Sequence, residues 1–256
     1  MTSSGTCSYF ILQKSKYTTI DNDDENQIIT IDNNNNNNIN QIKNIYILPY
    51  NNIDYYTNNG LFEKGLIEWS KQFCSSDKNI LDIGAHTGTY AISLAHLCNK
   101  VYAFEPQQMS YYALCGSVAL SNIQNINCMK YGLGSESQVG IQTLNIVSDD
   151  GGGSTLHSGN SGNNNIVKTE TINVKTLDRF NIRNISFIKM DVKDNELNVL
   201  QGALNTLKNS NYPKIVFESN TYNEKLFNFL KGLNYNIVKI DGVNNMFLAS
   251  KFLEKT

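Results

Sequence analysis

Residues 80–91, with the sequence ILDIGAHTGTYA, combine the pattern of a buried strand, a glycine turn and the start of a helix. Ile80, Leu81 and Ile83 form the apolar run of a central parallel strand. The apolar residues that follow recur at helical spacing: Ala91, Leu94, Ala95 and Cys98. A strand and a helix joined by a tight turn make a βα unit, so the sequence predicts an α/β protein with a parallel sheet.

The turn and the next strand together predict a nucleoside ligand. Gly84 and Gly88 allow a sharp bend and the close approach of a ligand, and the first N–H groups of the helix face the same crevice. The next apolar run, residues 100–104, ends in Glu105, which lies 105 − 82 = 23 positions after Asp82. An acid at this strand end is placed to accept both hydroxyls of a ribose.

The residues around the turn favour S-adenosylmethionine over a dinucleotide. A dinucleotide site needs a second glycine two places after Gly84, where this chain has His86. Asp82, just before the turn, would repel a pyrophosphate and attract a cationic amino-acid group, directly or through water. S-adenosylmethionine carries a ribose, an ammonium and a sulfonium, and it has no phosphate.

Three motifs in this order resemble those of the FkbM family of class I S-adenosylmethionine-dependent methyltransferases. Residues 81–88 (LDIGAHTG) are similar to its Leu-Asp-Ile-Gly-Ala-Asn-x-Gly signature, and residues 104–106 (FEP) to its second motif. Residues 187–192 (FIKMDV), followed by Glu196 and Leu200, resemble its Ile-Lys-Ile-Asp-Val-Glu-Gly-x-Glu block. The resemblance covers roughly residues 60–250.

The resemblance implies a Rossmann-like fold: a mostly parallel seven-stranded sheet, helices on both faces and a C-terminal antiparallel hairpin. It implies methylation of a hydroxyl of a sugar, glycan or small molecule. The cofactor-binding residues would be Asp82, Gly84, Ala85, His86, Gly88, Glu105, Pro106 and Gly132, the last beside the adenine. His86 replaces the family asparagine and would contact the cofactor carboxylate.

Periodicity places the other elements. Strands are expected at 100–104, 126–131, 185–190 and 214–217, an extra antiparallel pair at 140–147 and 167–174, a further strand at 45–48, and the hairpin at 235–240 and 246–249. Helices are expected at 61–73, 111–118, 176–180, 197–207 and 226–233. Tyr55, Tyr56 and Phe62 either line the site or pack in the core, and core packing is favoured.

The chain divides into two parts. Residues 1–44 are rich in asparagine and expected to be disordered, with short strands at 9–12 and 28–31 as the alternative. Residues 45–256 form the methyltransferase domain. Its insertion, residues 148–165, is either a disordered tip, which is favoured, or a substrate lid in which Ser154, Thr155 and His157 touch substrate.

Four acids end predicted strands and should meet at one edge of the sheet: Asp82, Glu105, Asp191 and Glu218. Asp191 is the first candidate for holding or deprotonating the acceptor hydroxyl, and Glu218 is the second. The structural alternatives are that Asp191 caps a helix and that Glu218 ends its strand in solvent.

One departure from the family motif bears on the acceptor site. Lys193 and Asp194 stand where the family has Glu-Gly, so the acceptor pocket should differ in charge and shape. A minority hypothesis gives Asp191, Asp194 and Glu218 a Mg²⁺ ion. The expected metal content is otherwise none, since the five cysteines include no Cys-x-x-Cys pair.

Composition narrows the remaining classes. A net charge of −2 gives no global positive field, which argues against nucleic acid and anionic membranes as partners. An RNA ribose 2′-O-methyltransferase, pairing Asp191 and Glu218 with Lys189 or Lys193, is one alternative, and a non-catalytic scaffold is another. With no run of 18 apolar residues and no signal peptide, a soluble cytoplasmic protein is expected. The oligomeric state is left open.

Overall fold

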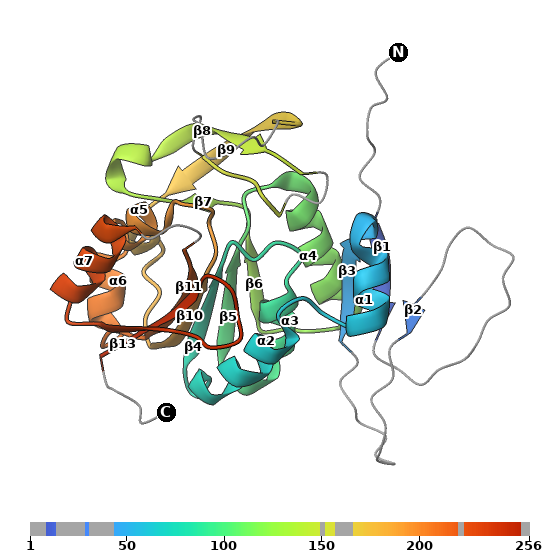
Figure 1. Ribbon diagram of the computed structural model, residues 1–256, viewed down its shortest axis with the longest axis horizontal. Coiled ribbons are helices and arrows are strands. Elements are labelled where there is room, and N and C mark those ends of the chain that lie inside the picture. Colours follow the sequence, from blue (N-terminus) through green and yellow to red (C-terminus); the bar gives the residue numbers. More distant parts are fainter. Residues whose placement is uncertain are drawn as a thin grey trace, which may run out of the picture.

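A computed structural model describes residues 9–13, 29–30, 44–148, 152–156, 166–219 and 223–251. Its centre is a seven-stranded sheet of order β12-β13-β11-β10-β4-β5-β6 (Figure 1). The five parallel strands are β4 (Asn79–Ile83), β5 (Lys100–Phe104), β6 (Ile126–Met129), β10 (Ile185–Met190) and β11 (Lys214–Glu218). The hairpin strands β12 (Asn236–Lys239) and β13 (Met246–Ser250) run antiparallel. The predicted Rossmann-like methyltransferase sheet is confirmed.

Helices cover both faces of this sheet because alternate strand residues point to opposite sides. Val101 and Ala103 belong to the core on the face covered by α2 (Lys64–Ser70), α3 (Thr89–Leu94) and α4 (Gln108–Leu120). Leu81 and Ile83 belong to the core on the other face. That face is covered by α5 (Glu196–Gln201), α6 (Leu204–Asn209) and α7 (Glu224–Gly232).

Several helices differ from their predicted bounds. The helix α1 (Ile53–Asn59) was not predicted, and the predicted helix 61–73 consists of α2 and the 3-10 turn Lys71–Phe73. The predicted helix 197–207 breaks into α5 and α6 at Gly202. A Cβ atom there would lie 2.1 Å from the carbonyl oxygen of Gly134, so the chain bends where it meets another loop. The predicted helix 176–180 is the 3-10 turn Leu177–Phe180.

A second, three-stranded sheet of order β7-β9-β8 lies above the large sheet in Figure 1. The antiparallel pairing of β8 (Gly140–Ile146) with β9 (Lys168–Lys175) was predicted. The predicted strand 126–131 was too long, because β6 ends at Met129. The chain then turns, and β7 (Gly132–Leu133) pairs with β9 instead of continuing the large sheet.

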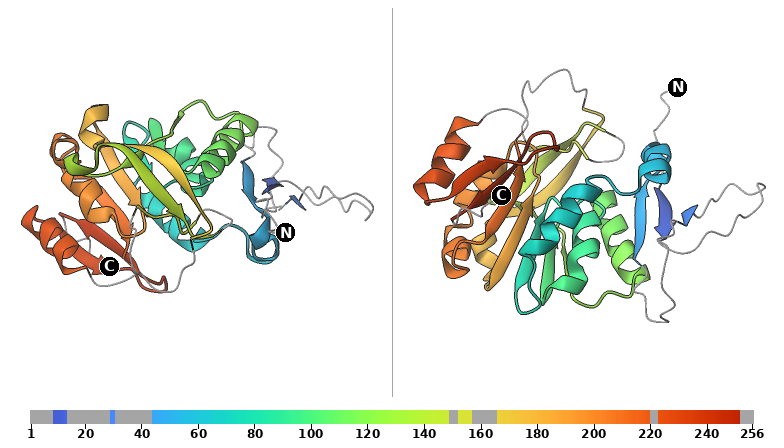
Figure 2. Two further views of the ribbon diagram at one scale, coloured as in Figure 1. Left: turned by 90° about the horizontal axis from the view of Figure 1, so that it is seen from above. Right: turned by 60° about the horizontal axis from the view of Figure 1, so that its bottom comes forward.

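The N-terminal strands form a third sheet at one side of the molecule, beside α4 (Figure 2). In it, β1 (Tyr9–Gln13) lies between β2 (Ile29–Thr30) and β3 (Ile45–Pro49). Backbone N–H groups of β3 bond to α4 and its C-cap: Ile45 donates to Ser121 Oγ and Ile47 to Ser117 Oγ, both at 2.8 Å. The predicted strand at 45–48 is therefore present outside the large sheet, and the described residues 9–13 and 29–30 match the strand alternative to the favoured disorder.

The predicted disorder of residues 1–44 falls mostly on residues outside the described part. The same holds for residues 149–151 and 157–165 of the insertion. Within the described ranges, every helix is too short or too polar to cross a lipid bilayer.

Candidate active site

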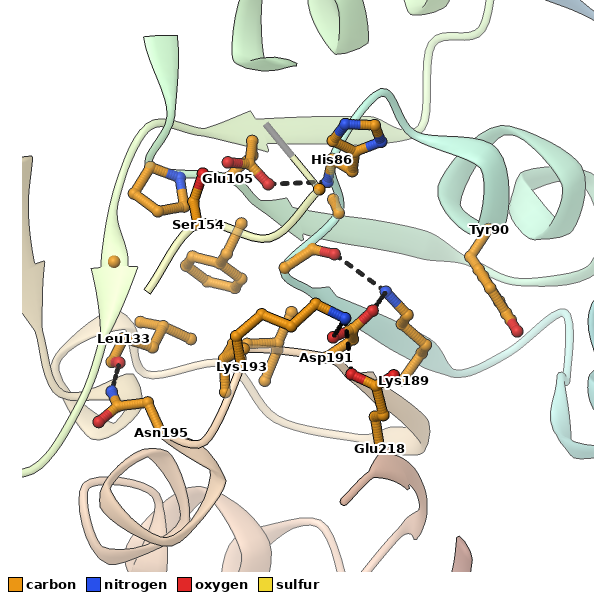
Figure 3. A pocket seen from close by; sticks show the side chains of 18 of the residues that line it. His86, Tyr90, Glu105, Leu133, Ser154, Lys189, Asp191, Lys193, Asn195 and Glu218 are labelled. Atoms are coloured by element: carbon orange, nitrogen blue, oxygen red, sulfur yellow. Dashed lines mark hydrogen bonds and ion pairs between the residues drawn. The ribbon is translucent and has the colours of Figure 1, made fainter. Parts of the chain in front are cut away.

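A cavity of about 320 Å³ lies at the carboxyl ends of β4, β5, β10 and β11, and residues of the small sheet also line it (Figure 3). Of the ten predicted site residues, eight line it: Gly84, Ala85, His86, Glu105, Pro106, Gly132, Asp191 and Glu218. Asp82 and Gly88 do not. Tyr56 and Phe62 also line the cavity, whereas Tyr55 stacks on Phe62 with ring centroids 4.0 Å apart and lies outside it.

Glu105 connects the glycine turn to the cavity. Its Oε2 atom accepts a hydrogen bond from the backbone N–H of His86, and its Oε1 atom accepts one from the backbone N–H of Gln107, both at 2.8 Å. Burial raises the pKa of Glu105 to about 7, and the two N–H donors offset only part of this effect. Since each carboxylate oxygen has a second lone pair, Glu105 can still accept hydrogen bonds from two hydroxyls.

The two glycines of the turn serve close packing. Gly84 has φ 73°, and a Cβ atom there would lie 1.9 Å from the backbone oxygen of Asp191. Gly88 has φ 89°, and its Cβ would lie 2.5 Å from Leu114 Cδ1 of α4. Gly84 thus allows the ends of β4 and β10 to meet at the cavity, and Gly88 allows α3 to pack against α4.

Asp82 lies beneath the cavity instead of lining it. The side chain is buried, and its Oδ2 atom accepts a hydrogen bond from the backbone N–H of Ala91 at 3.0 Å. Burial raises its pKa, and nearby Lys189 partly offsets this. Asp82 therefore stabilises the start of α3 and the turn that precedes it.

Lys189 is a buried cation for which the sequence alone suggests a role only in the RNA alternative. Its Nζ atom donates to the backbone oxygen of Gly84 at 2.9 Å and lies 3.8 Å from Asp82 Oδ1 and 3.9 Å from Asp191 Oδ2. Burial acts to lower the pKa of Lys189, but Asp191 and Asp82 outweigh it and keep the pKa above its usual value. The sequence signal for this buried ion pair is a lysine within the apolar run 187–190, because lysine is rarely buried unless it is paired.

Asp191, Lys193 and Glu218 form a charged cluster on the cavity wall (Figure 3). The Nζ atom of Lys193 lies 2.9 Å from Asp191 Oδ1 and 2.6 Å from Glu218 Oε2. Burial acts to raise the pKa of Asp191, but Lys189 and Lys193 outweigh it and hold the pKa below its usual value. Burial and the nearby Asp191 raise the pKa of Glu218.

The structural alternatives for these two acids are wrong. Asp191 does not cap α5, because the N-cap residue is Asn195. Glu218 is not in open solvent, since its side chain is 19% exposed and is paired with Lys193. The structure does not favour the Mg²⁺ hypothesis, because the ammonium of Lys193 lies between Asp191 and Glu218, two of the three proposed ligands. No group of three His, Cys, Asp or Glu side chains suited to a metal occurs in the described part of the chain.

The described part of the insertion, residues 152–156, forms a wall of the cavity. Ser154 and Leu156 line it, and Thr155 Oγ1 donates to the backbone oxygen of Lys193 at 3.0 Å. This position matches the lid alternative more closely than the favoured disordered tip. His157 lies outside the described residues.

Further lining residues had no assigned role in the sequence analysis. The hydroxyl of Tyr90 donates to Glu63 Oε2 at 2.8 Å, and both residues line the cavity. Asn195 donates to the backbone oxygen of Leu133 at 3.0 Å and joins the loop after β10 to the small sheet. No sequence motif predicts these contacts, because they join loops that come together only when the chain folds.

The sheet order, the antiparallel hairpin and the cavity at the strand ends define a Rossmann-like methyltransferase. A model of the methyltransferase FkbM domain matches residues 82–237, which is more than half of the chain. The protein therefore belongs to the FkbM methyltransferase family.

Several solved structures are similar to this chain. FkbM methyltransferase from Methylobacillus flagellatus is 18% identical with a TM-score of 0.48, and the match covers 69% of this chain but only 44% of that one. An rRNA methylase from Streptococcus thermophilus is 12% identical with a TM-score of 0.44, and the match covers 74% and 96% of the two chains. A Streptococcus mutans protein named as a methyltransferase, in complex with SAH, is 14% identical with a TM-score of 0.44, and the match covers 72% and 94%. No curated protein matches the chain.

Proposed function

We propose that this protein transfers the methyl group of S-adenosylmethionine to a hydroxyl of a sugar, glycan or small molecule. The observation that carries the proposal is the shared cavity. At one end Glu105 and the glycine turn offer a nucleoside site, and at the other end Asp191 and Glu218 offer groups that can hold and deprotonate a hydroxyl.

The residues at the first end fit the cofactor. Glu105 would accept the ribose hydroxyls, and the adenine would lie among the other residues that line the same cavity, which include Pro106, Gly132 and apolar side chains. Those side chains are Leu133, Leu144, Leu156 and Ile172. When bound, S-adenosylmethionine supplies a methyl group made electrophilic by the sulfonium.

The charged cluster supports a division of labour between the two acids. A raised pKa makes Glu218 the better proton acceptor, whereas Asp191, whose pKa is lowered, stays ionised and suits holding the hydroxyl in line. Glu218 would take the proton of the acceptor hydroxyl while the methyl–sulfur bond breaks, the oxygen–methyl bond forms and S-adenosylhomocysteine leaves. This assignment reverses the order that the sequence alone predicts for the two residues.

The alternatives receive less support. Lys189 is buried under the turn and Lys193 is paired with two carboxylates, so neither contributes a basic surface for RNA. A scaffold without catalysis would have no need for a buried, ionisable cluster facing a cavity.

Calorimetric titration with S-adenosylmethionine and, separately, with NAD tests the proposal. Saturable binding of S-adenosylmethionine alone is expected, and it would be followed by a screen of sugar and small-molecule hydroxyls with labelled methyl donor. Binding of NAD alone, or of neither ligand, would contradict the proposal.

A further inference from the structure

Lys193 projects from the loop after β10 into the space between two carboxylates (Figure 3). An ammonium has three N–H donors and no acceptor. Within the described part of the chain, Asp191 and Glu218 are its side-chain partners, at 2.9 and 2.6 Å. The contact with Glu218 is a hydrogen bond and that with Asp191 is an ion pair, so at least one N–H is left for a ligand in the cavity that Lys193 lines.

The backbone that carries this side chain is held in an unfavourable conformation. Lys193 has φ 49° and the next residue, Asp194, has φ 72°, a left-handed pair without glycine. Such conformations persist only where the surrounding structure imposes them, and they cluster at functional sites. Here the hydrogen bond from Thr155 Oγ1 to the backbone oxygen of Lys193 helps to hold the loop.

The charge at this position reverses that of the motif which the chain otherwise resembles. A glutamate at position 193 would place a third carboxylate beside Asp191 and Glu218, and oxygen ligands in such a group suit divalent cations. Lysine places a positive charge there instead. Lys189 and Lys193 are then the two cations that face the carboxyl groups of Asp82, Asp191 and Glu218.

We propose that the ammonium of Lys193 is the permanent cation of the methyl-transfer site. It lies between Asp191 and Glu218, in the position that a divalent metal ion would otherwise occupy. The ammonium holds Asp191 and Glu218 together, and its third N–H binds the oxygen of the acceptor hydroxyl while Glu218 takes the proton. This inference rests on the proposed methyl transfer and adds a catalytic residue to it.

Titration with Mn²⁺ tests the proposal without an acceptor. Lys193→Met keeps most of the length of the side chain, removes the ammonium and adds only a thioether, which is a poor ligand for Mn²⁺, whereas Lys193→Arg keeps a cation. The expected result is that Lys193→Met binds Mn²⁺ at least about tenfold more tightly than the wild type and Lys193→Arg. Equal Mn²⁺ affinity in all three proteins would overturn the proposal.

A double variant locates the ion. Lys193→Met combined with Glu218→Gln should lose the gained Mn²⁺ binding, and retained binding would place the ion elsewhere and overturn the assignment. Circular dichroism and S-adenosylmethionine titration of each variant separate the two hypotheses. A wild type that does not bind S-adenosylmethionine contradicts the proposed function, whereas normal cofactor binding with unchanged Mn²⁺ affinities contradicts only the role of Lys193.

Discussion

The backbone N–H of His86 donates a 2.8 Å hydrogen bond to Oε2 of Glu105 and thereby fastens the turn after β4 to the end of β5. Oε1 of the same side chain holds the backbone N–H of Gln107. One buried carboxylate thus shapes the turn and faces the cavity, so its replacement should affect both the backbone and ligand binding.

Glu105→Gln should weaken S-adenosylmethionine binding about tenfold to a hundredfold, because one acceptor oxygen becomes a donor and hydrogen bonds to charged groups contribute about 1.5–3 kcal/mol. Calorimetry measures the effect. Glu136→Gln, which alters a carboxylate exposed at the surface and paired with Arg179, is the control and should bind normally. Unchanged affinity in Glu105→Gln would remove Glu105 from the ribose site.

Glu218→Gln should keep cofactor affinity and lower kcat by about 10²–10⁴, the usual effect of losing a general base.

Asp191→Asn should also keep cofactor affinity and lose turnover, because the acceptor is no longer held in line. Transfer of labelled methyl to an acceptor found in the screen measures both. Near-normal turnover in either variant would remove that residue from the mechanism.

Gly84→Ala should destabilise the protein by more than about 2 kcal/mol, because its Cβ would lie 1.9 Å from the backbone oxygen of Asp191 at a left-handed φ. Gly65→Ala is the matched control. Gly65 lies within α2 and a Cβ there meets nothing within 4 Å, so this change should stabilise the helix by up to about 1 kcal/mol. Urea denaturation measures both, and equal effects would show that the contact at Gly84 is relieved without cost.

Glu196→Gln should change the dependence of stability on pH. Glu196 is buried at the start of α5, accepts the backbone N–H of Val192 at 3.2 Å, and has a pKa raised by burial from 4.5 to about 7. Between these values the unfolded chain is ionised while the folded chain keeps the proton, so this group makes stability fall as pH rises.

Glutamine keeps an acceptor for Val192 and does not ionise. The free energy of unfolding of Glu196→Gln should therefore exceed that of the wild type by about 1–3 kcal/mol near pH 8, and by much less near pH 5. Thermal or chemical denaturation at the two pH values measures the difference. A variant less stable than the wild type at both would show that the ionised carboxylate is needed.

Local sequence was enough for much of this structure. The motif at 80–91 predicted β4, the turn and α3, and apolar periodicity predicted the other parallel strands, the β8–β9 pair and the C-terminal hairpin. These elements follow from burial on one or both faces of a strand or helix, which leaves a repeating pattern along the chain.

Other elements depended on contacts between distant segments. The break between α5 and α6 arises where Gly202 meets the backbone of Gly134, and β6 ends early because Gly132 and Leu133 pair with β9. The helix α1 was missed because its polar sequence, IDYYTNN, has only Tyr56 as a buried residue. In the first two cases the deciding interaction joins residues far apart in the sequence.

By itself, the sequence determined the family, the parallel sheet and the edge at which Glu105, Asp191 and Glu218 lie, because the carboxyl ends of parallel strands share one edge. Only the tertiary structure decided which ionisable side chains near this edge are buried and which of them are paired. Asp82 is buried and accepts a hydrogen bond from the start of α3, and Lys189 is its buried counter-ion. Lys193 forms ion pairs with two carboxylates, those of Asp191 and Glu218. Charge and pKa depend on burial and on neighbours within a few ångströms, and those neighbours meet only when the loops fold together.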